Sequence, residues 1–412
     1  MMLHAPIHHT FAPHVTFRTV LRSLALILTP FRWKRGAAVE SLRHALADTF
    51  HAEAFLFSSG REALLALLKA LDLRAGEEVI IQGYTCVVLP NAIHATGAVT
   101  VYVDIDYHSL NMSVDAVEHA FTPRTRAVIC QHTFGIPSDV SALRELCDRH
   151  HAVLIEDCAH VMPDPSGPSA ISSRGDFILF SFGRDKAISG ITGGAILSRK
   201  SDVSKRLKEE EDRATDLSSL RIARLLAYPA TYFTARLLFA VGLGRIFLKC
   251  AQLLGLLVPI LRREEKRGYM SPLLTRLPNA CAALALDSFR HLRPINDHRR
   301  ALTRFYLAEG RTRGWSLLSS ISEDLPLQKF PLFTKNADRI RRSLKRQNIH
   351  LDDGWTTCVV CPPSADPLLA AYDPQSDPEA EAACEKILTL PTHPTMTLSQ
   401  ARRLTEILDP LL

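Results

Sequence analysis

The stretch AVLIEDCAHVMPDPSGPSAISSRGDFILFSFGRDKAISGITGGAILS, residues 152–198, contains three short apolar runs separated by polar and glycine-containing segments. The runs are AVLIED (152–157), DFILFSF (176–182) and GGAILS (193–198). Runs of this length that are apolar at successive positions are typical of strands buried on both faces of a sheet. The stretch therefore predicts three strands in the core of an α/β domain.

Four more apolar runs precede this stretch: AFLFSS (54–59), EVIIQ (78–82), VTVYVDI (99–105) and RAVICQHT (126–133). Segments with the period of a helix separate these four runs from one another, and a further such segment separates the last run from AVLIED. They are REALLALLKAL after Gly60, VVLPNAIHATG, SVDAVEHAFT with Ser113 as N-cap, and DVSALRELCDRH with Ser138 or Asp139 as N-cap. This alternation predicts a doubly wound, mostly parallel sheet, in which ligands bind at the carboxyl ends of the strands.

The pattern divides the chain into four predicted parts. Residues 1–36 form an N-terminal arm, 37–200 the large α/β domain, 201–270 an apolar helical insertion, and 271–412 a smaller α+β domain. The last part mixes helical segments with the strand-like run LPLQKFPLF (325–333).

Two apolar segments lie outside the alternating region. VTFRTVLRSLALILTPFRWKRG (15–36) lacks a small-residue cleavage site and is too short to span a bilayer, so we expect an interfacial helix or a packed arm. Residues 217–261 are strongly apolar but interrupted by Arg236, Arg245 and Lys249. We expect helices buried against a partner subunit or the core, or a peripheral contact with a membrane.

The composition excludes several classes of protein. With 47% apolar and 22% charged residues the chain is predicted to be ordered and globular. The net charge of +6 is not arranged as a basic-aromatic surface, which argues against a nucleic-acid partner. The nine cysteines lack the spacing of a disulfide-rich domain, and Cys358 and Cys361 form a CxxC without a second pair. We therefore expect no metal site and a cytoplasmic protein, with a peripheral position at the inner membrane left open.

Polar residues stand where three predicted strands end. Asp157 ends AVLIED, Ser181 lies at the end of DFILFSF with Lys186 five residues further on, and Ser59 and Gly60 follow AFLFSS. A helix starting at Gly60 offers backbone N–H groups to a phosphate. A carboxylate in the position of Asp157 needs a cationic or hydrogen-bonding partner, such as the pyridinium nitrogen of pyridoxal phosphate (PLP).

Each of these residues also has a purely structural interpretation. Asp157 could cap a helix or pair with an arginine, and Lys186 could be a solvated loop lysine. A lysine that is partly desolvated in such a loop is, however, able to attack a carbonyl carbon. A phosphate-binding turn, a buried acid and a loop lysine together are the parts of a PLP site, and the sequence therefore predicts PLP as cofactor.

At these residues the sequence resembles the DegT/DnrJ/StrS family of PLP-dependent aminotransferases. The resemblance lies in SSGREALLALLKALDLRAGEEVI, TGAVTVYVDID, IEDCAH, the SF and Lys of SFGRDK, TGGAIL and LTLPTHPTMT. It implies the fold of the aspartate-aminotransferase type and a catalytic role for Lys186, as the lysine that forms a Schiff base with PLP and shuttles the proton. It further implies that Asp157 binds the pyridinium nitrogen, that His160 lies near the ring oxygen, and that Ser181 and the backbone of Gly60 and Arg61 hold the phosphate.

The sequence departs from the family at three of these places. Arg61 replaces a threonine, and its guanidinium could bind the phosphate as an ion pair. Cys86 stands where an aromatic residue usually stacks on the cofactor, so that Tyr84 or another residue would have to replace it. Leu274 stands where an asparagine usually reaches the phosphate of the neighbouring subunit, two residues before the retained Arg276.

The resemblance implies a homodimer that moves an amino group from an amino acid, often glutamate, to a keto acceptor, by family a nucleotide-linked keto sugar. The apolar insertion leaves a lipid-linked acceptor open. One alternative is a PLP-dependent sugar dehydratase of the same family, but such enzymes usually replace the lysine by histidine, whereas this chain keeps Lys186. The other is a non-catalytic, membrane-associated relative.

Overall fold

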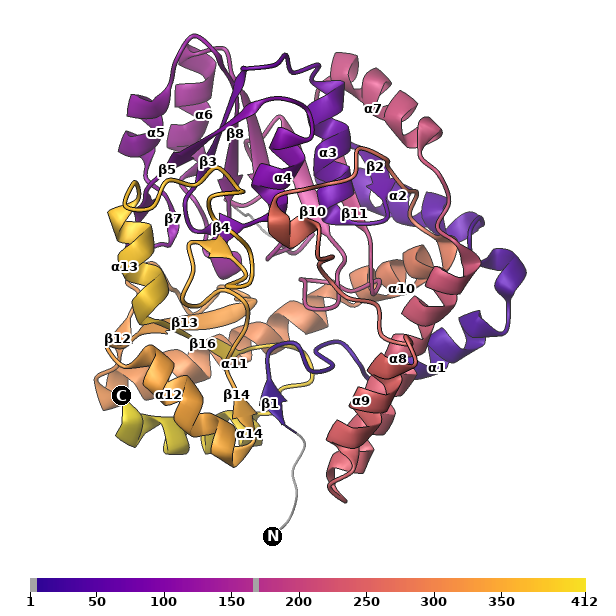
Figure 1. Ribbon diagram of the computed structural model, residues 1–412, viewed down its shortest axis with the longest axis vertical. Coiled ribbons are helices and arrows are strands. Elements are labelled where there is room, and N and C mark those ends of the chain that lie inside the picture. Colours follow the sequence, from indigo (N-terminus) through magenta and orange to yellow (C-terminus); the bar gives the residue numbers. More distant parts are fainter. Residues whose placement is uncertain (1–5, 166–169) are drawn as a thin grey trace.

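The computed structural model describes residues 6–165 and 170–412. All seven predicted strands of the large domain are present, and they pair in one sheet (Figure 1). They are β2 (Glu53–Phe57), β3 (Glu78–Gln82), β5 (Val99–Val103), β8 (Thr125–Gln131), β9 (Val153–Asp157), β10 (Phe177–Ser181) and β11 (Gly194–Ser198). The order across the sheet is β2-β11-β10-β9-β8-β3-β5. Strand β11 is antiparallel to both neighbours and the other pairs are parallel, as the predicted mostly parallel sheet requires.

Helices cover both faces of this sheet. They are α2 (Ala37–Phe50), α3 (Gly60–Ala70), α4 (Val88–His94), α5 (Val114–Ala120), α6 (Val140–Arg149) and α7 (Ser201–Arg213). Because successive strand residues point to opposite faces, Ile81 belongs to the core that also contains residues of α3, α4 and α7, whereas Ile80 belongs to the core with α5 and α6. The side chains of Ser113 and Asp139 accept the N-cap hydrogen bonds of α5 and α6, so that Asp139, and not Ser138, caps α6.

The N-terminal arm and the apolar insertion pack together. They contain α1 (Phe17–Ile27), η1 (Pro30–Arg32), α8 (Ser219–Phe239), α9 (Gly244–Leu253) and η3 (Glu265–Arg267). Helix α1 lies along α8, and the Ser23 hydroxyl donates to the Leu226 carbonyl at 2.5 Å. Buried residues of α8 and the arm share one core with α2 and with α10 (Asn279–Arg290). In the described parts of the chain no helix has the length and apolar character needed to cross a membrane.

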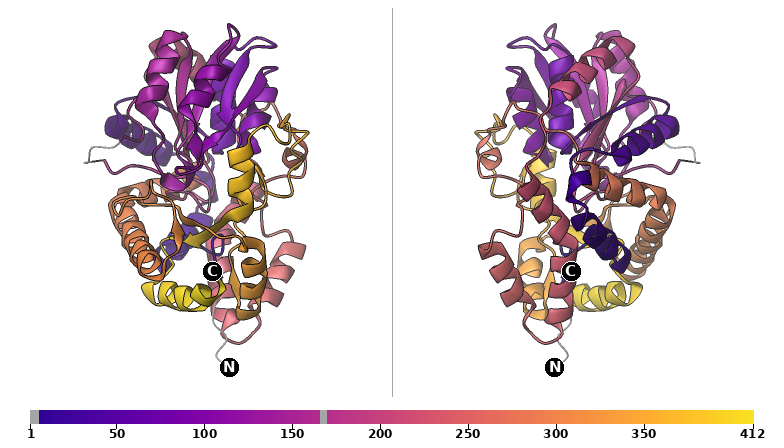
Figure 2. Two further views of the ribbon diagram at one scale, coloured as in Figure 1. Left: turned by 90° about the vertical axis from the view of Figure 1, so that its left-hand side faces the viewer. Right: turned by 90° about the vertical axis from the view of Figure 1, so that its right-hand side faces the viewer.

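The C-terminal elements lie at one end of the large sheet (Figure 2). The helices are α11 (Leu292–Arg313), α12 (Ala337–Leu344), α13 (Pro378–Lys386) and α14 (Leu398–Leu408). An antiparallel sheet of β12 (Ser316–Leu317), β13 (Lys329–Phe333) and β16 (Ile387–Pro391) packs with them. The helices and the strand expected there from the sequence are present, and the boundaries between the four parts remain a prediction.

Short elements connect these layers. Strand β1 (Ile7–His8) of the arm pairs with β14 (Ile349–His350), and β4 (Thr85–Cys86) of the large domain pairs with β15 (Val360–Cys361). The remaining elements are β6 (Ile105–Asp106), β7 (Asn111–Met112), η2 (Thr133–Gly135), η4 (Lys345–Gln347) and η5 (Asp409–Leu411). The C-terminal segments are therefore joined by backbone hydrogen bonds to both the arm and the large domain.

A buried ion pair lies where the arm meets the C-terminal sheet. Lys329 Nζ is 2.9 Å from Asp353 Oδ2, and the two side chains are 4% and 0% exposed. The Thr389 hydroxyl donates to the same carboxylate at 2.7 Å. Burial alone would raise the pKa of Asp353, but Lys329 and then His9 lower it to about 2. Asp353 is therefore a buried anion whose neutralisation depends chiefly on Lys329.

We expect Lys329→Met to destabilise the protein by about 3–5 kcal/mol, because it leaves the Asp353 carboxylate buried without its cation. Urea unfolding followed by circular dichroism measures the change. The double variant Lys329→Met/Asp353→Leu should recover much of the loss. Arg311→Met breaks the exposed pair with Glu323 and should cost less than about 1 kcal/mol. Equal stability of Lys329→Met and wild type would contradict this account of the pair.

Candidate active site

The start of α3 forms a cradle of closely packed backbone. Ser59 is the N-cap, and its hydroxyl accepts the Glu62 N–H at 3.4 Å. A Cβ added to Gly60 would lie 3.0 Å from the Ser181 Cβ, and one added to Gly194 would lie 2.4 Å from the Gly60 Cα. The first N–H groups of a helix have no intrahelical acceptor and carry the positive end of its dipole. The structure thus places Ser59, Gly60 and Ser181 together in a site suited to an anion.

Lys186 lies beside this cradle, in the loop between β10 and β11. A Cβ on Gly183 would be 3.2 Å from the Lys186 Cγ and 3.8 Å from the Ser181 Oγ. The Lys186 carbonyl accepts from Arg299 Nη2 at 3.0 Å and from His14 Nε2 at 2.8 Å. Burial, then Arg299, lowers the pKa of His14 to about 3, so its ring is neutral. The arm and α11 therefore hold the lysine loop at its backbone.

Asp157 ends the central strand β9 and is 3% exposed. Its carboxylate accepts the Ala159 N–H at 2.9 Å. Burial raises the pKa of Asp157, while the Ala159 N–H, Lys186 and His132 lower it in that order. A carboxylate that is buried with so few partners is stabilised by a further cation or N–H donor. The pyridinium nitrogen of PLP is a suitable partner.

His160, three residues further on, is also buried near Lys186. Its Nδ1 accepts the Phe134 N–H at 3.1 Å, so the neutral ring carries its proton on Nε2. Burial, then Lys186 and Lys329, hold the pKa of His160 well below its usual value. The Trp355 ring packs edge-on against the imidazole, with 4.7 Å between the ring centroids. The neutral His160 ring is thus held with its Nε2–H available as a hydrogen-bond donor. An interaction with the ring oxygen of PLP requires such a donor.

Arg61 and Cys86 have surroundings that the sequence did not predict. The Arg61 guanidinium pairs with Glu265 and donates to the Ile260 carbonyl at 2.8 Å, so binding a phosphate would require it to exchange these partners. Cys86 lies half-buried on β4, near enough to Lys186 and Asp157 for their charges to act on it, and burial raises the pKa of its thiol. Cys86 supplies no ring for stacking.

The Tyr84 ring packs edge-on with Phe134 and Trp355, so stacking on PLP would require it to leave these partners. The Tyr84 side chain is fully buried, and its hydroxyl donates to the Trp355 carbonyl. Trp355, which no local sequence pattern singles out, packs edge-on against His160, and the Phe134 ring is stacked with the same imidazole at 5.8 Å between centroids.

The segment 274–276 lies along the Ser59 turn of the same chain. The Ser58 N–H donates to the Thr275 carbonyl at 2.8 Å, and the Thr275 hydroxyl donates to Glu62 at 2.6 Å. The Arg276 guanidinium donates to the Glu211 carbonyl of α7. Leu274 is buried. These residues therefore stabilise the start of α3 through hydrogen bonds within the same chain.

Helix α8 reaches the lysine loop, which the sequence did not predict. Arg184 stands two residues before Lys186. Its guanidinium carbon lies 4.3 Å from the centroid of the Tyr228 ring of α8. Tyr228 is 4% exposed, and burial raises its pKa. An arginine over an aromatic ring is stabilised by a cation–π interaction. The apolar insertion thus packs against the loop that carries Lys186.

Among the residues that the structure describes, His132, Glu156 and Cys158 form one group with the spacing of metal ligands. Hydrogen bonds account for its geometry. Glu156 accepts backbone N–H groups from Ser172 and Gly175 at 2.6 Å each and lies 3.2 Å from His132 Nε2. His132 Nδ1 accepts the Ser138 N–H. Both side chains are occupied as structural acceptors and donors, and we assign them no metal.

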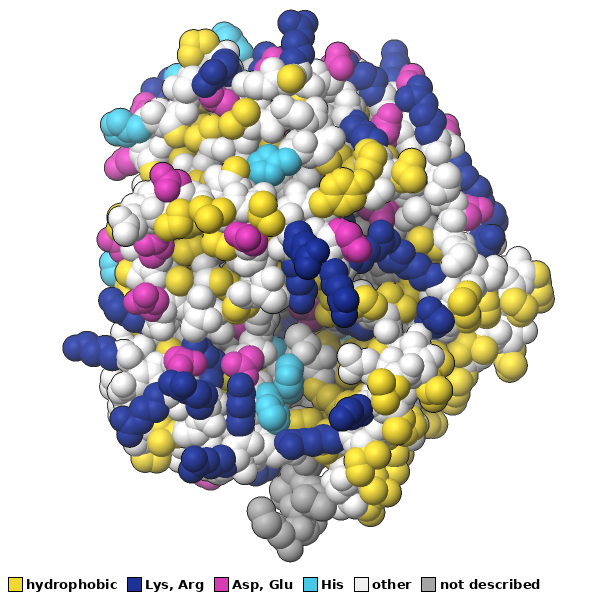
Figure 3. All heavy atoms as spheres, in the orientation of Figure 1, with side chains coloured by type: hydrophobic (Ala, Val, Ile, Leu, Met, Phe, Trp, Pro, Cys, Tyr) yellow, Lys and Arg dark blue, Asp and Glu magenta, His cyan; other side chains and the backbone are white. Residues whose placement is uncertain are grey.

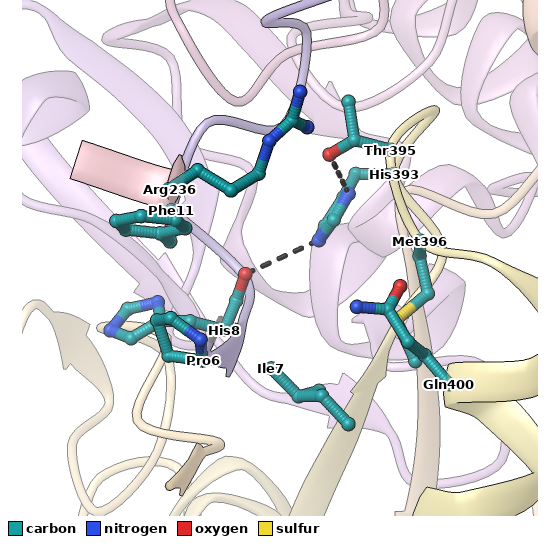
Figure 4. Close-up of a pocket in the computed structure, with 9 residues that line it drawn as sticks. All are labelled: Pro6, Ile7, His8, Phe11, Arg236, His393, Thr395, Met396 and Gln400. Atoms are coloured by element: carbon teal, nitrogen blue, oxygen red, sulfur yellow. Dashed lines mark hydrogen bonds between the residues drawn. The ribbon is translucent and has the colours of Figure 1, made fainter. Parts of the chain in front are cut away.

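A cavity of about 30 Å³ lies where the arm meets α8 and the segment before α14 (Figure 4). His393 Nε2 contacts the His8 carbonyl at 3.2 Å across it. The residues lining it are Pro6, Ile7, His8, Phe11, Arg236, His393, Thr395, Met396 and Gln400. Neither Lys186 nor Asp157 is among them, so this cavity belongs to the packing of the arm.

Residues 20–218 and 257–409 match the DegT/DnrJ/EryC1/StrS aminotransferase family. The chain belongs to this family. The predicted resemblance is therefore confirmed for most of the chain, and residues 219–256, which contain α8 and α9, lie outside the match.

Several proteins of known name or structure are similar to this chain. A UDP-N-acetyl-3-dehydro-α-D-glucosamine 3-aminotransferase of Acidithiobacillus ferrooxidans is 24% identical over 383 residues, covering 91% of this chain and 88% of that protein. A GDP-perosamine synthase of Vibrio cholerae is 29% identical over 52% of this chain and 58% of its own length. The structure of NtdA from Bacillus subtilis with bound cofactor PMP superposes with a TM-score of 0.74 at 21% identity, covering 99% and 85% of the two chains. The predicted fold class is confirmed.

We expect Gly60→Ala to weaken PLP binding by at least about tenfold, because the new methyl group would displace the helix start from Ser181 and disturb the phosphate cradle. Titration of the apoprotein with PLP, followed by tryptophan fluorescence, gives the dissociation constant. Ser181→Ala keeps the shape and removes one hydroxyl, so its effect should be smaller. Unchanged affinity of Gly60→Ala would place the phosphate elsewhere.

Proposed function

We propose that this chain is a PLP-dependent aminotransferase that moves the amino group of glutamate onto a nucleotide-linked keto sugar. The observation that carries the proposal is the convergence of Lys186, Asp157 and the Ser59–Gly60 helix start at one edge of the sheet. These groups match the parts of PLP that a protein must hold: the carbonyl carbon, the ring nitrogen and the phosphate.

Each residue has a role that follows from its surroundings. PLP, when bound, supplies an electron sink that stabilises negative charge at the substrate carbon. The Lys186 amine would hold the cofactor covalently and move the proton at the substrate carbon. The Asp157 carboxylate would keep a proton on the ring nitrogen, and the His160 Nε2–H would donate to the ring oxygen. Ser181 and the first N–H groups of α3 would bind the phosphate.

The substrates are proposed from the relatives. The names of the two bacterial relatives above refer to nucleotide-linked sugars, which supports an acceptor of that class. A relative from Micromonospora echinospora, 36% identical over 36% of this chain, is an L-glutamine:2-deoxy-scyllo-inosose aminotransferase. Glutamine is therefore the donor to compare with glutamate.

We expect Lys186→Ala and Lys186→His to lose amino transfer almost completely, because neither side chain supplies an amine. The test mixes PLP-loaded protein with ¹⁵N-labelled glutamate or glutamine and a keto sugar, and measures the released 2-oxo acid and the label in the sugar. The Tyr228→Phe variant keeps the ring over Arg184 and should stay within about threefold of wild type. Transfer by Lys186→Ala at the wild-type rate, or none by wild type with either donor, would overturn the proposal.

The assembly and location are also proposals. We propose a cytoplasmic homodimer in which residues 217–261 contact a membrane surface peripherally. All nine cysteines are free, which agrees with a reducing compartment, and the family resemblance supports the dimer. Sedimentation equilibrium should give twice the mass of the chain, and a single-chain mass at micromolar concentration would contradict the dimer.

A further inference from the structure

Two helices present apolar side chains on their exposed sides. On α1, Phe17, Leu21, Leu24 and Leu28, the last at its C-cap, follow one another at intervals of three or four residues and are 42–79% exposed. That spacing places them on one face of the helix. Soluble proteins seldom expose apolar side chains in such continuous rows, and those that do use them as contact surfaces.

Helix α9 carries a second row. Leu243 at its N-cap, Ile246 and Leu253 are 50–78% exposed, and Leu254 directly after the helix is 72% exposed. Helix α8 packs against both α1 and α9 and connects the two rows. Figure 3 shows hydrophobic side chains along the lower right edge of the molecule, where α1 and α9 lie in Figure 1.

The same segments are cationic. Residues 1–39 contain five Lys or Arg and residues 217–263 contain seven, and neither segment contains an Asp or Glu. Arg18 and Arg22 pair with Asp287 of α10. Among the described residues, none of the five basic side chains of α8 and α9 forms a salt bridge, and Arg245 and Lys249 are exposed. Apolar rows and positive charge thus occur on the same helices.

Most of this surface has no counterpart in the family match. The match stops at residue 218 and resumes at 257, so it does not include α8 and α9. The family match therefore assigns no shared role to the exposed side of these two helices.

We propose that α1, α8 and α9 together form a docking surface for a bilayer that contains anionic phospholipid. Helices of this character lie in the interface with their apolar rows in the headgroup and acyl boundary, and basic side chains bind the lipid phosphates. The inference rests on the proposed membrane contact of 217–261, adds α1 to it and names the lipid chemistry. It does not depend on the aminotransferase reaction.

The charge pattern favours a bilayer over a second copy of this chain. In a twofold-symmetric dimer the same surface meets itself, so the basic side chains of α8 and α9 would face each other. Like charges brought together in a protein contact are unfavourable. An anionic lipid surface satisfies both the apolar and the cationic character.

A groove of about 290 Å³ beside α9 has the same character. Phe11 of the arm, Tyr232 and Phe239 of α8 and Leu248 of α9 supply apolar walls, and Arg245 supplies a cation. An acyl chain and a lipid phosphate are complementary to these two kinds of group. Apart from Phe11, these residues lie in the part of the chain that the family does not match.

The full-length protein can be tested by co-sedimentation with vesicles. We expect binding to phosphatidylcholine vesicles that contain about 30% phosphatidylglycerol, and little binding to pure phosphatidylcholine. Raising the salt from about 0.1 M to 0.5 M NaCl should weaken it, because salt screens exposed charges. Leu253→Ser/Leu254→Ser and Arg245→Gln/Lys249→Gln should each lower the partition coefficient by at least about tenfold.

Matched variants elsewhere on the surface distinguish binding through this site from nonspecific adsorption to the vesicles. Leu368→Ser/Leu369→Ser removes two exposed leucines that lie outside α1, α8 and α9. Lys205→Gln/Arg206→Gln removes two exposed charges of α7. Both should bind within about twofold of wild type. Thermal melts should show that all four variants are folded, since the changed side chains are all exposed.

Each contrary result has a clear meaning. Failure to bind the anionic vesicles overturns the proposal, and equal binding to both vesicle types overturns its lipid chemistry. If the α9 variants instead change a dimer into a monomer, the surface is a contact between copies and the proposal is wrong. Amino transfer to a water-soluble keto sugar, measured on the same variants, should stay at the wild-type rate. Wild-type protein that binds the anionic vesicles but transfers no amino group would refute only the proposed function.

Discussion

The Asp157 carboxylate, buried at the end of the central strand, is the constraint on which the site depends. Burial raises its pKa, and the Ala159 N–H, Lys186 and His132 only partly offset that effect. The register of the sheet pairs Asp157 with Leu179 of β10 and Gln131 of β8, which fixes the carboxylate between the neighbouring strand ends. Ser181 follows two residues after Leu179, and the cradle at Gly60 packs directly against Ser181. A buried acid, an amine and an anion site are thus held in fixed relation by backbone pairing.

Much of this arrangement could be predicted from the sequence, because local patterns encode it. Strands buried on both faces appear as continuous apolar runs, and all seven were found close to their true ends. Asp157 and Lys186 were identified because polar residues after such runs gather at one edge of the sheet. The predicted N-cap at Ser113 is present for the same local reason.

The contacts that hold the site residues in place could not be predicted, because residues far away in the sequence supply them. His14 and Arg299 hold the Lys186 carbonyl, although more than a hundred residues separate either from the lysine. Trp355 packs on His160 from a loop without any motif. Glu265 comes from the end of the insertion and takes the Arg61 guanidinium, which the sequence suggested for the phosphate. Partners of this kind come together only when the whole chain is folded, so no local sequence pattern indicates them.

The central claim, that Lys186 is the residue that holds PLP, has one direct test. The protein is loaded with PLP, reduced with borohydride, digested and mapped by mass spectrometry. The account predicts a pyridoxyl group on the peptide that contains Lys186 and none on Lys329, the buried lysine that is paired with Asp353. Labelling of Lys329 or another lysine in place of Lys186, or no labelling at all, would contradict it.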